Sequence, residues 1–135
     1  MLTGQLIHPE ILHFLSLCGH GSKILIADGN YPLKAKTVNA NKIYLGLTPG
    51  TPTVTDVLKA VNSVANFEAM KVMTPDDGKE PEIFDEFQSI LPDCPMEKLG
   101  RYEFYDACCQ QDVELAISTG EERPYANSLV TVGCA

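Results

Sequence analysis

Amphipathic helices and short apolar strands alternate along almost the whole chain, and this order limits the folds that it can adopt. The clearest helix is predicted over 53–65, where Thr53 and Asp56 have capping-box spacing and apolar residues recur at helical intervals. The clearest strand is Lys23–Ala27, an apolar run that ends in turn-forming residues. Such alternation favours layered α/β packing around one sheet.

The remaining elements follow from the same periodicities. Further helices are predicted over 9–18, 83–91 and 102–110, and further strands over 43–47, 67–73, 113–118 and 128–132. Neither a linker nor an internal repeat divides the chain. We therefore expect residues 1–135 to form a single domain.

Charge and hydropathy narrow the possible partners. The formal net charge of −8, without a cluster of Lys and Arg, argues against binding to nucleic acid. No apolar run approaches the roughly 20 residues of a membrane span. The start of the chain, Met1-Leu2-Thr3-Gly4, lacks the basic region of a signal peptide. We expect a cytoplasmic protein without a membrane partner.

The cysteines and glycines do not form a recognisable metal or nucleotide motif. The five cysteines include no C-x-x-C pair, so neither zinc nor a disulfide framework is expected, and reduced thiols suit the cytoplasm. Adjacent Cys108 and Cys109 are interpreted as small apolar residues of a helix. The run Gly19-x-Gly21-x-Lys23 is too short for a phosphate loop, and no G-x-S-x-G motif indicates a serine nucleophile.

Two polar residues stand at the ends of predicted elements. His20 lies between Gly19 and Gly21, where a ligand can approach the imidazole; alternatively, it is a surface histidine favoured by a helix C-terminus. Asp28 follows the strand Lys23–Ala27, at the end where open α/β sheets usually bind ligands. Its alternative interpretation is a turn-forming aspartate.

A third polar segment covers 120–127, with the sequence Gly-Glu-Glu-Arg-Pro-Tyr-Ala-Asn. Its phenol, carboxamide and carboxylate groups could hydrogen-bond sugar hydroxyls, and the ring of Tyr125 could cover an apolar sugar face. The alternative is a polar connection between two strands.

Together these segments resemble the ribose pyranase/fucose mutarotase family, RbsD/FucU. The similarity rests on Gly19-His20, on Asp28 eight residues after the histidine, and on Pro32 four residues later. It continues in Arg101-Tyr102-Glu103-Phe104-Tyr105, which is similar to the fucose branch, and in Gly120-Glu121-x-x-x-Tyr125-Ala126-Asn127. The resemblance extends from the first helix to the closing strand.

The resemblance implies a fold, an assembly and a set of site residues. The family fold is a three-layer α/β/α sandwich that forms pentamers or decamers, with sites where subunits meet. His20 would be the catalytic acid/base. Asp28, Arg101, Tyr125 and Asn127 would hold the sugar.

Three departures from the family pattern bear on these expectations. Ser22 stands where family members carry an aspartate, so the orientation of His20 or the turn around it is expected to differ. The spacing from Arg101 to Gly120 is longer than in the fucose branch. Tyr125-Ala126-Asn127 resembles the ribose branch instead, so the two branches are mixed in this chain.

The implied reaction is mutarotation, in which a hemiacetal opens and closes again. It requires proton transfer and neither a redox cofactor nor a metal, and histidine suits it because its ordinary pKa is about 6.5. The main alternative is a non-catalytic sugar-binding or regulatory module of the same fold. A structural oligomer without a ligand is a third interpretation, which leaves the joint spacing of the motifs unexplained.

Overall fold

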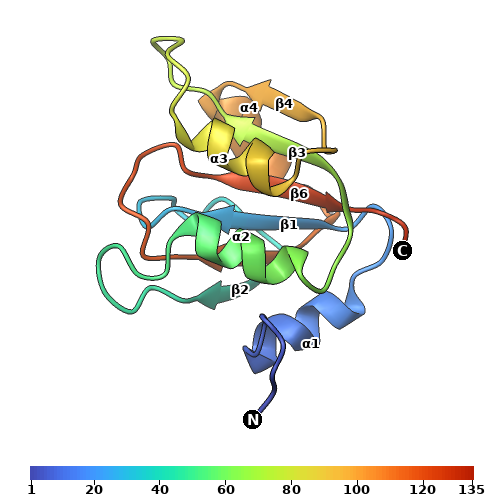
Figure 1. Cartoon of the computed structure of the whole chain (residues 1–135). Helices are drawn as coiled ribbons and strands as arrows, with labels where there is room; N and C mark the ends of the chain where they lie inside the picture. The colour runs from blue at the N-terminus through green and yellow to red at the C-terminus, as the bar shows by residue number, and fades with distance from the viewer.

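The computed structural model describes residues 1–135 and contains one six-stranded sheet with four helices (Figure 1). The helices are α1 (Pro9–Leu17), α2 (Val54–Asn62), α3 (Ile83–Ile90) and α4 (Arg101–Cys108). The strands are β1 (Lys23–Ala27), β2 (Asn41–Tyr44), β3 (Phe67–Met73), β4 (Met96–Leu99), β5 (Val113–Ser118) and β6 (Ser128–Val132). No helix is long and apolar enough to cross a membrane.

The sheet has the strand order β2-β5-β1-β6-β3-β4. Strand β6 is antiparallel to both of its neighbours, β1 and β3, whereas all other pairs are parallel. The carboxyl ends of five strands and the amino end of β6 therefore meet at one edge, which we call the carboxyl edge. The opposite edge, where β1 and β3 begin and β6 ends, is called the amino edge.

Helices cover both faces of the sheet, which confirms the three-layer α/β/α sandwich. Figure 1 shows α2 and α3 in front of the sheet and α4 behind it. Alternate residues of β1 enter different cores: Ile24 and Ile26 join the larger cluster with α1, α2 and α3, and Leu25 and Ala27 join the smaller cluster with α4. This alternation is the period-two pattern of a strand that is buried on both faces.

Local sequence signals explain where several elements begin. Pro9 occupies the first turn of α1, and the ring of His8 accepts a hydrogen bond from the N–H of Ile11. At α2 the predicted capping box is confirmed, because the Thr53 hydroxyl accepts from the N–H of Asp56 and the Asp56 carboxylate accepts from the N–H of Thr53. A cap of this kind contributes about 1 kcal/mol.

The predictions for the central strands are confirmed at their bounds, and those for the two edge strands are not. Strand β2 covers Asn41–Tyr44 rather than 43–47, and β4 was not predicted. Both outer strands have four residues, and β4 is only partly buried. Short strands with little apolar content lack the pattern that identifies a buried strand.

Candidate functional site

Four of the five predicted site residues lie at the carboxyl edge of the sheet. Asp28 follows β1, Asn127 precedes β6, Tyr125 lies in the loop between β5 and β6, and Arg101 is the first residue of α4. The sheet order explains this convergence, because β1 and β6 are neighbours although Asp28 and Asn127 are 99 residues apart in the chain.

Asp28 and Asn127 form a buried pair, each with only 3% of its surface exposed. The backbone N–H of Asp28 donates to Oδ1 of Asn127 at 2.9 Å, and Nδ2 of Asn127 donates to Oδ2 of Asp28 at 3.1 Å. The N–H of Asn30 donates to the other carboxylate oxygen at 2.8 Å. Asp28 lines a cavity, so its carboxylate can also accept a hydrogen bond from a ligand there.

Burial raises the pKa of Asp28 above its ordinary value of 3.8, because the charged carboxylate loses water. Hydrogen bonds from Asn30 and Asn127 favour the charged form and only partly offset the effect of burial. A carboxyl group with a raised pKa in a cavity is suited to accept hydrogen bonds and to exchange protons.

Arg101 and Tyr125 form a second pair at this edge. Nη2 of Arg101 donates to the Tyr125 hydroxyl at 2.8 Å, and the guanidinium lies 5.7 Å from the centroid of the ring. Tyr125 has a φ of 62°, in the left-handed region that bulky residues seldom adopt. Such backbone strain persists where the surrounding structure holds it, and it concentrates at functional sites.

Asp28, Arg101 and Tyr125 border a cavity of about 210 Å³, and Asn127 contacts it through its bond to Asp28. Its size is below the roughly 300–1,000 Å³ of pockets for drug-sized molecules, so it suits a small ligand. The lining residues are Asp28, Asn30, Tyr31, Met73, Arg101, Tyr105, Pro124 and Tyr125. Asn30, Tyr31 and Met73 carry no site signal in the sequence, because they come from two separate segments, the turn after β1 and the end of β3, whose proximity depends on the folded sheet.

The aromatic residues give one side of this cavity an apolar wall. Tyr31 and Tyr105 meet edge to face with ring centroids 5.5 Å apart, and the Tyr31 hydroxyl donates to the carbonyl of Lys36 at 3.1 Å. Aromatic faces beside carboxylate, amide and guanidinium groups can bind the apolar and polar sides of a sugar ring together.

Glu121 braces the loop that carries Tyr125. Its side chain is 5% exposed and accepts bonds from Nε, Nη2 and the backbone N–H of Arg123, and from the N–H of Val54 at the start of α2. Burial alone would raise the pKa of Glu121, but these bonds and the positive charge of Arg123 outweigh it and lower the pKa below 4.5. This carboxylate is therefore occupied by hydrogen bonds within the protein.

The segment 120–127 also contacts α3 and the loop before α2. Nη1 of Arg123 donates to Oε2 of Glu86 on α3 at 2.5 Å. Gly120 is pressed against the loop before α2, since a Cβ there would lie 2.4 Å from the carbonyl oxygen of Thr51. The segment 120–127 thus has little freedom, which fixes the positions of Tyr125 and Asn127.

His20 lies at the amino edge, away from the other four predicted residues. It precedes β1, whereas Asp28 follows it, and a five-residue strand separates the edges by about 16 Å. Nε2 of His20 is 3.1 Å from both carboxylate oxygens of Glu68, at the start of β3. The sequence held no signal for this pair, because its members are 48 residues apart.

Ser22 holds the turn that carries His20. Its hydroxyl accepts a hydrogen bond from the N–H of Gly19 at 3.1 Å and donates to Oε1 of Glu114 at 2.7 Å. Ser22 thus contacts the turn and Glu114 rather than the ring of His20.

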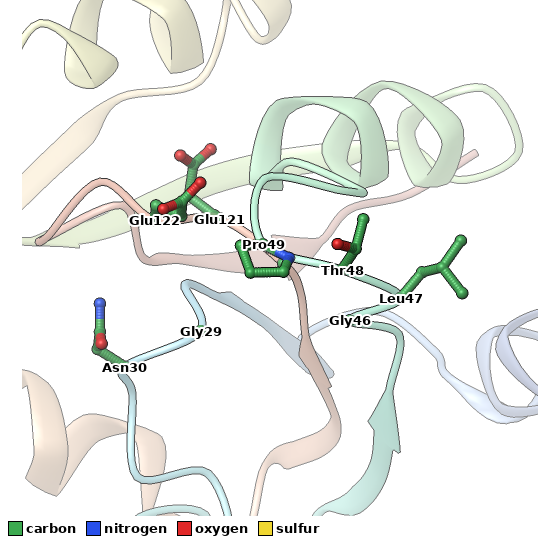
Figure 2. Close-up of a pocket in the computed structure, with 9 residues that line it drawn as sticks. Gly29, Asn30, Gly46, Leu47, Thr48, Pro49, Glu121 and Glu122 are labelled. Atoms are coloured by element: carbon green, nitrogen blue, oxygen red, sulfur yellow. The ribbon is translucent and has the colours of Figure 1, made fainter.

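A second, larger cavity of about 510 Å³ lies beside the first at the carboxyl edge. Figure 2 shows residues from the turn after β1, the loop after β2 and the loop after β5 around it. Asn30 borders both cavities, but none of the predicted site residues lines the larger one. Its polar lining side chains are Asn30, Thr48, Glu121 and Glu122, and the Glu121 carboxylate is bonded to Arg123.

The site can act on a ligand through hydrogen bonds and proton transfer. Asp28 accepts, Arg101 donates, and Asn127 does both. No three His, Cys, Asp or Glu side chains come together in a way that could hold a metal ion.

Comparisons with known proteins agree with this geometry. The model of the RbsD / FucU transport protein family matches residues 1–135. A D-ribose pyranase of Paracidovorax citrulli is 31% identical over 133 residues, which cover 98% of each chain.

Solved structures show the same architecture. The Bacillus subtilis RbsD complexed with D-ribose superposes with a TM-score of 0.87 at 25% identity, over 100% of this chain and 99% of that chain. FucU from Bifidobacterium longum gives a TM-score of 0.82 at 26% identity, over 96% of each chain.

Proposed function

This chain belongs to the RbsD/FucU family, and from that membership we propose that it is a monosaccharide mutarotase carried by one domain, residues 1–135. It interconverts the anomers of a free sugar, and pyranose with furanose forms, by acid/base-assisted ring opening. The observation that carries the proposal is the small cavity at the carboxyl edge, where the buried Asp28–Asn127 pair meets Arg101 and Tyr125.

Each group in the cavity has a role in holding the sugar. Asp28, which lines the cavity, accepts a hydrogen bond from a sugar hydroxyl, and Asn127 holds the Asp28 carboxylate and donates to the sugar through its second amide N–H. Arg101 binds a second hydroxyl and keeps the phenol of Tyr125 in place. The rings of Tyr31 and Tyr105 cover the apolar face of the sugar.

His20 is the proposed proton carrier, with general acid–base help worth roughly 100- to 10,000-fold in rate. Because His20 lies at the amino edge of its own chain, we propose that the site is completed by His20 of a neighbouring subunit in a ring-like pentamer or decamer. The interface should be largely apolar and bury well above ~1,000 Å² in total. Tyr125 or a water molecule is the candidate for the second proton carrier.

The same cavity would also serve a non-catalytic sugar-binding module, since Asp28, Asn127, Arg101 and Tyr125 bind without His20. A turnover measurement separates the two functions. The cytoplasm is the proposed compartment, because all five cysteines are free thiols.

The preferred substrate is proposed to be a fucose-like pyranose rather than ribose. Arg101, Phe104 and Tyr105 support this preference through their similarity to the fucose branch. The ribose pyranase and the ribose complex among the relatives, together with Tyr125-Ala126-Asn127, favour ribose as the second candidate.

The deciding experiment is saturation-transfer NMR of anomer exchange with L-fucose, D-ribose and D-galactose. Wild-type protein should accelerate exchange for at least one sugar above the rate in buffer. The variant His13→Ala is the matched control, because His13 is exposed on α1 and remote from the cavity. Sugar binding without any acceleration would favour the binding module instead.

A further inference from the structure

We propose that Glu68 is a positioning residue that orients the imidazole of His20 for proton transfer. This inference rests on the proposed function, because it concerns how the proton carrier of that reaction is held. Nε2 of His20 lies 3.1 Å from Oε1 and 3.1 Å from Oε2 of Glu68. An ionised carboxylate can only accept hydrogen bonds, so the proton of the neutral ring is on Nε2 and the lone pair is on Nδ1.

A local irregularity in the pairing of β3 directs the side chain of Glu68 toward His20. Phe67 pairs with Val132 of β6, but Ala69 pairs with Thr131, so Glu68 is an extra residue in the ladder. A bulge of this kind bends the strand and redirects a side chain, and bulges often lie next to active sites. Glu68 therefore projects beyond the regular sheet toward the turn that carries His20.

Residues at the end of β6 contact both Glu68 and the turn that carries His20. The N–H of Gly21, next to His20, donates to the carbonyl of Val132 at 2.9 Å, and the N–H of Val132 donates to Ser22 at 2.8 Å. Gly133 lies directly behind Glu68, since a Cβ there would be 3.1 Å from Cβ of Glu68. The His20 turn and Glu68 thus contact adjacent residues, Val132 at the end of β6 and Gly133 directly after it.

The pair is too exposed to serve mainly as a stabilising contact. The side chains of His20 and Glu68 are 58% and 45% exposed, and ion pairs in water contribute little to stability. Ser22 does not take this role, because its hydroxyl bonds with Gly19 and Glu114. Glu68 forms the one ion pair of His20.

This geometry assigns the reacting nitrogen. Nδ1 of His20 accepts the proton of the anomeric hydroxyl while the bond from C1 to the ring oxygen breaks and the ring oxygen takes a proton from water. The imidazolium that forms keeps its Nε2–H bond to Glu68, whose negative charge stabilises it. On ring closure Nδ1 returns its proton to the carbonyl oxygen, which becomes the new anomeric hydroxyl, and the attacking hydroxyl gives its proton to the hydroxide left by the first step, which restores the water.

The test compares Glu68→Ala with Glu68→Gln in the full-length protein, using sugar exchange and relaxation of ¹³C-labelled histidine rings. Glu68→Ala should lower kcat roughly 10- to 100-fold, with KM within about twofold, because Glu68 does not touch the sugar. The His20 ring should become more mobile in this variant. Glu68→Gln keeps an oxygen that can accept from Nε2, so it should retain most of the ring order and more of the rate.

Asp112→Ala is the matched control. Asp112 pairs with Lys23 at the same edge of the sheet and does not contact His20. A wild-type kcat in Glu68→Ala, a loss expressed only in KM, or an unchanged ring mobility would overturn the role of Glu68. If wild-type protein accelerates no sugar, the proposed function fails, while ring mobility still decides whether Glu68 orients His20.

Discussion

The two edges of the sheet carry their polar groups in opposite states of burial. At the carboxyl edge, Asp28 and Asn127 are 3% exposed and nearly all of their hydrogen-bonding groups have partners. At the amino edge, the side chain of His20 is 58% exposed and contacts one carboxylate. Within one chain, two of the proposed sugar-binding residues are buried and hydrogen-bonded, and the proposed proton carrier is open to solvent.

This difference in burial predicts that substitutions at the two edges affect catalysis and stability differently. Buried hydrogen-bonded groups contribute to stability as well as binding, because removing one partner leaves the other without compensation. Exposed groups can be replaced with little effect on the fold. Variants of the exposed His20 should therefore change catalysis alone, and variants of the buried Asp28–Asn127 pair should change catalysis and stability together.

The largest effect is expected for His20→Ala, which should lower exchange roughly 100- to 10,000-fold. Its free energy of unfolding should stay within about 0.5 kcal/mol of wild type, because the removed ring is mostly in water. Saturation transfer and urea unfolding measure the two quantities on the same preparation. Near-normal exchange in this variant would remove His20 from the mechanism.

Mixing two inactive variants tests whether the edges of neighbouring chains form one site. His20→Ala keeps an intact carboxyl edge, and Tyr125→Ala keeps an intact amino edge. If a site takes His20 from one subunit and Tyr125 from the next, random exchange of equal amounts should restore about a quarter of the wild-type sites. Activity is measured after denaturing and refolding the variants together.

Light scattering on dilute protein is the control for this mixing experiment, because it shows whether an oligomer forms and whether subunits have exchanged. A fully active monomer would contradict a shared site. So would verified mixed oligomers that recover no activity.

The third effect concerns stability at the carboxyl edge. Asn127→Ala leaves the N–H of Asp28 and one carboxylate oxygen without their protein partners, which should cost about 1–3 kcal/mol of unfolding free energy. Asn41→Ala is the control, because the exposed amide of Asn41 makes a single bond to the carbonyl of Glu114. Equal losses of unfolding free energy in the two variants would show that the buried bonds of Asn127 stabilise the fold no more than the exposed bond of Asn41.

The sequence predicted the fold wherever apolar runs were long. β1, β3, β5 and β6 were predicted at their bounds because most of their residues are apolar. β4 was missed because Met96–Leu99 is short and carries two charged residues in an outer position. The resemblance supplied the three-layer arrangement, which periodicity alone left open.

The candidate site was predictable only in part. Asp28 could be placed at the end of a strand, and its partner Asn127 followed from the family motif rather than from physical reasoning. The contacts of His20 could not be predicted, since Glu68 reaches it through a bulge and through the pairing of β3 with β6. Pairings across 48 or 99 residues depend on strand order, which local patterns do not encode.

A smaller effect should appear when the charge of Glu121 is removed. Its pKa is lowered in the folded state, so its contribution to stability is present above pH 4.5 and is lost as the pH falls through the folded value. Glu121→Gln should lower the unfolding free energy by about 1 kcal/mol at pH 7, and the difference from wild type should shrink below pH 4.5. Glu122→Gln is the control, because Glu122 is the exposed neighbour. A difference that is independent of pH would show that the charge of Glu121 does not stabilise the loop.

The smallest effect concerns which sugar fits the carboxyl edge. Wild-type protein should exchange L-fucose faster than D-ribose at equal enzyme concentration, and Arg101→His should lower the ratio of the two rates by about tenfold or less. The reason is that Arg101 offers several donors in a fixed fork, one of which already orients the Tyr125 hydroxyl, while histidine offers at most two.

Because Arg101 is only partly buried, this variant should unfold like wild type, so a change in the ratio reports on the site rather than on the fold. Saturation transfer with both sugars in one sample measures the ratio directly. Faster exchange of ribose by the wild-type protein would assign the chain to ribose, and an unchanged ratio in Arg101→His would show that the aromatic wall, rather than the guanidinium, selects the sugar.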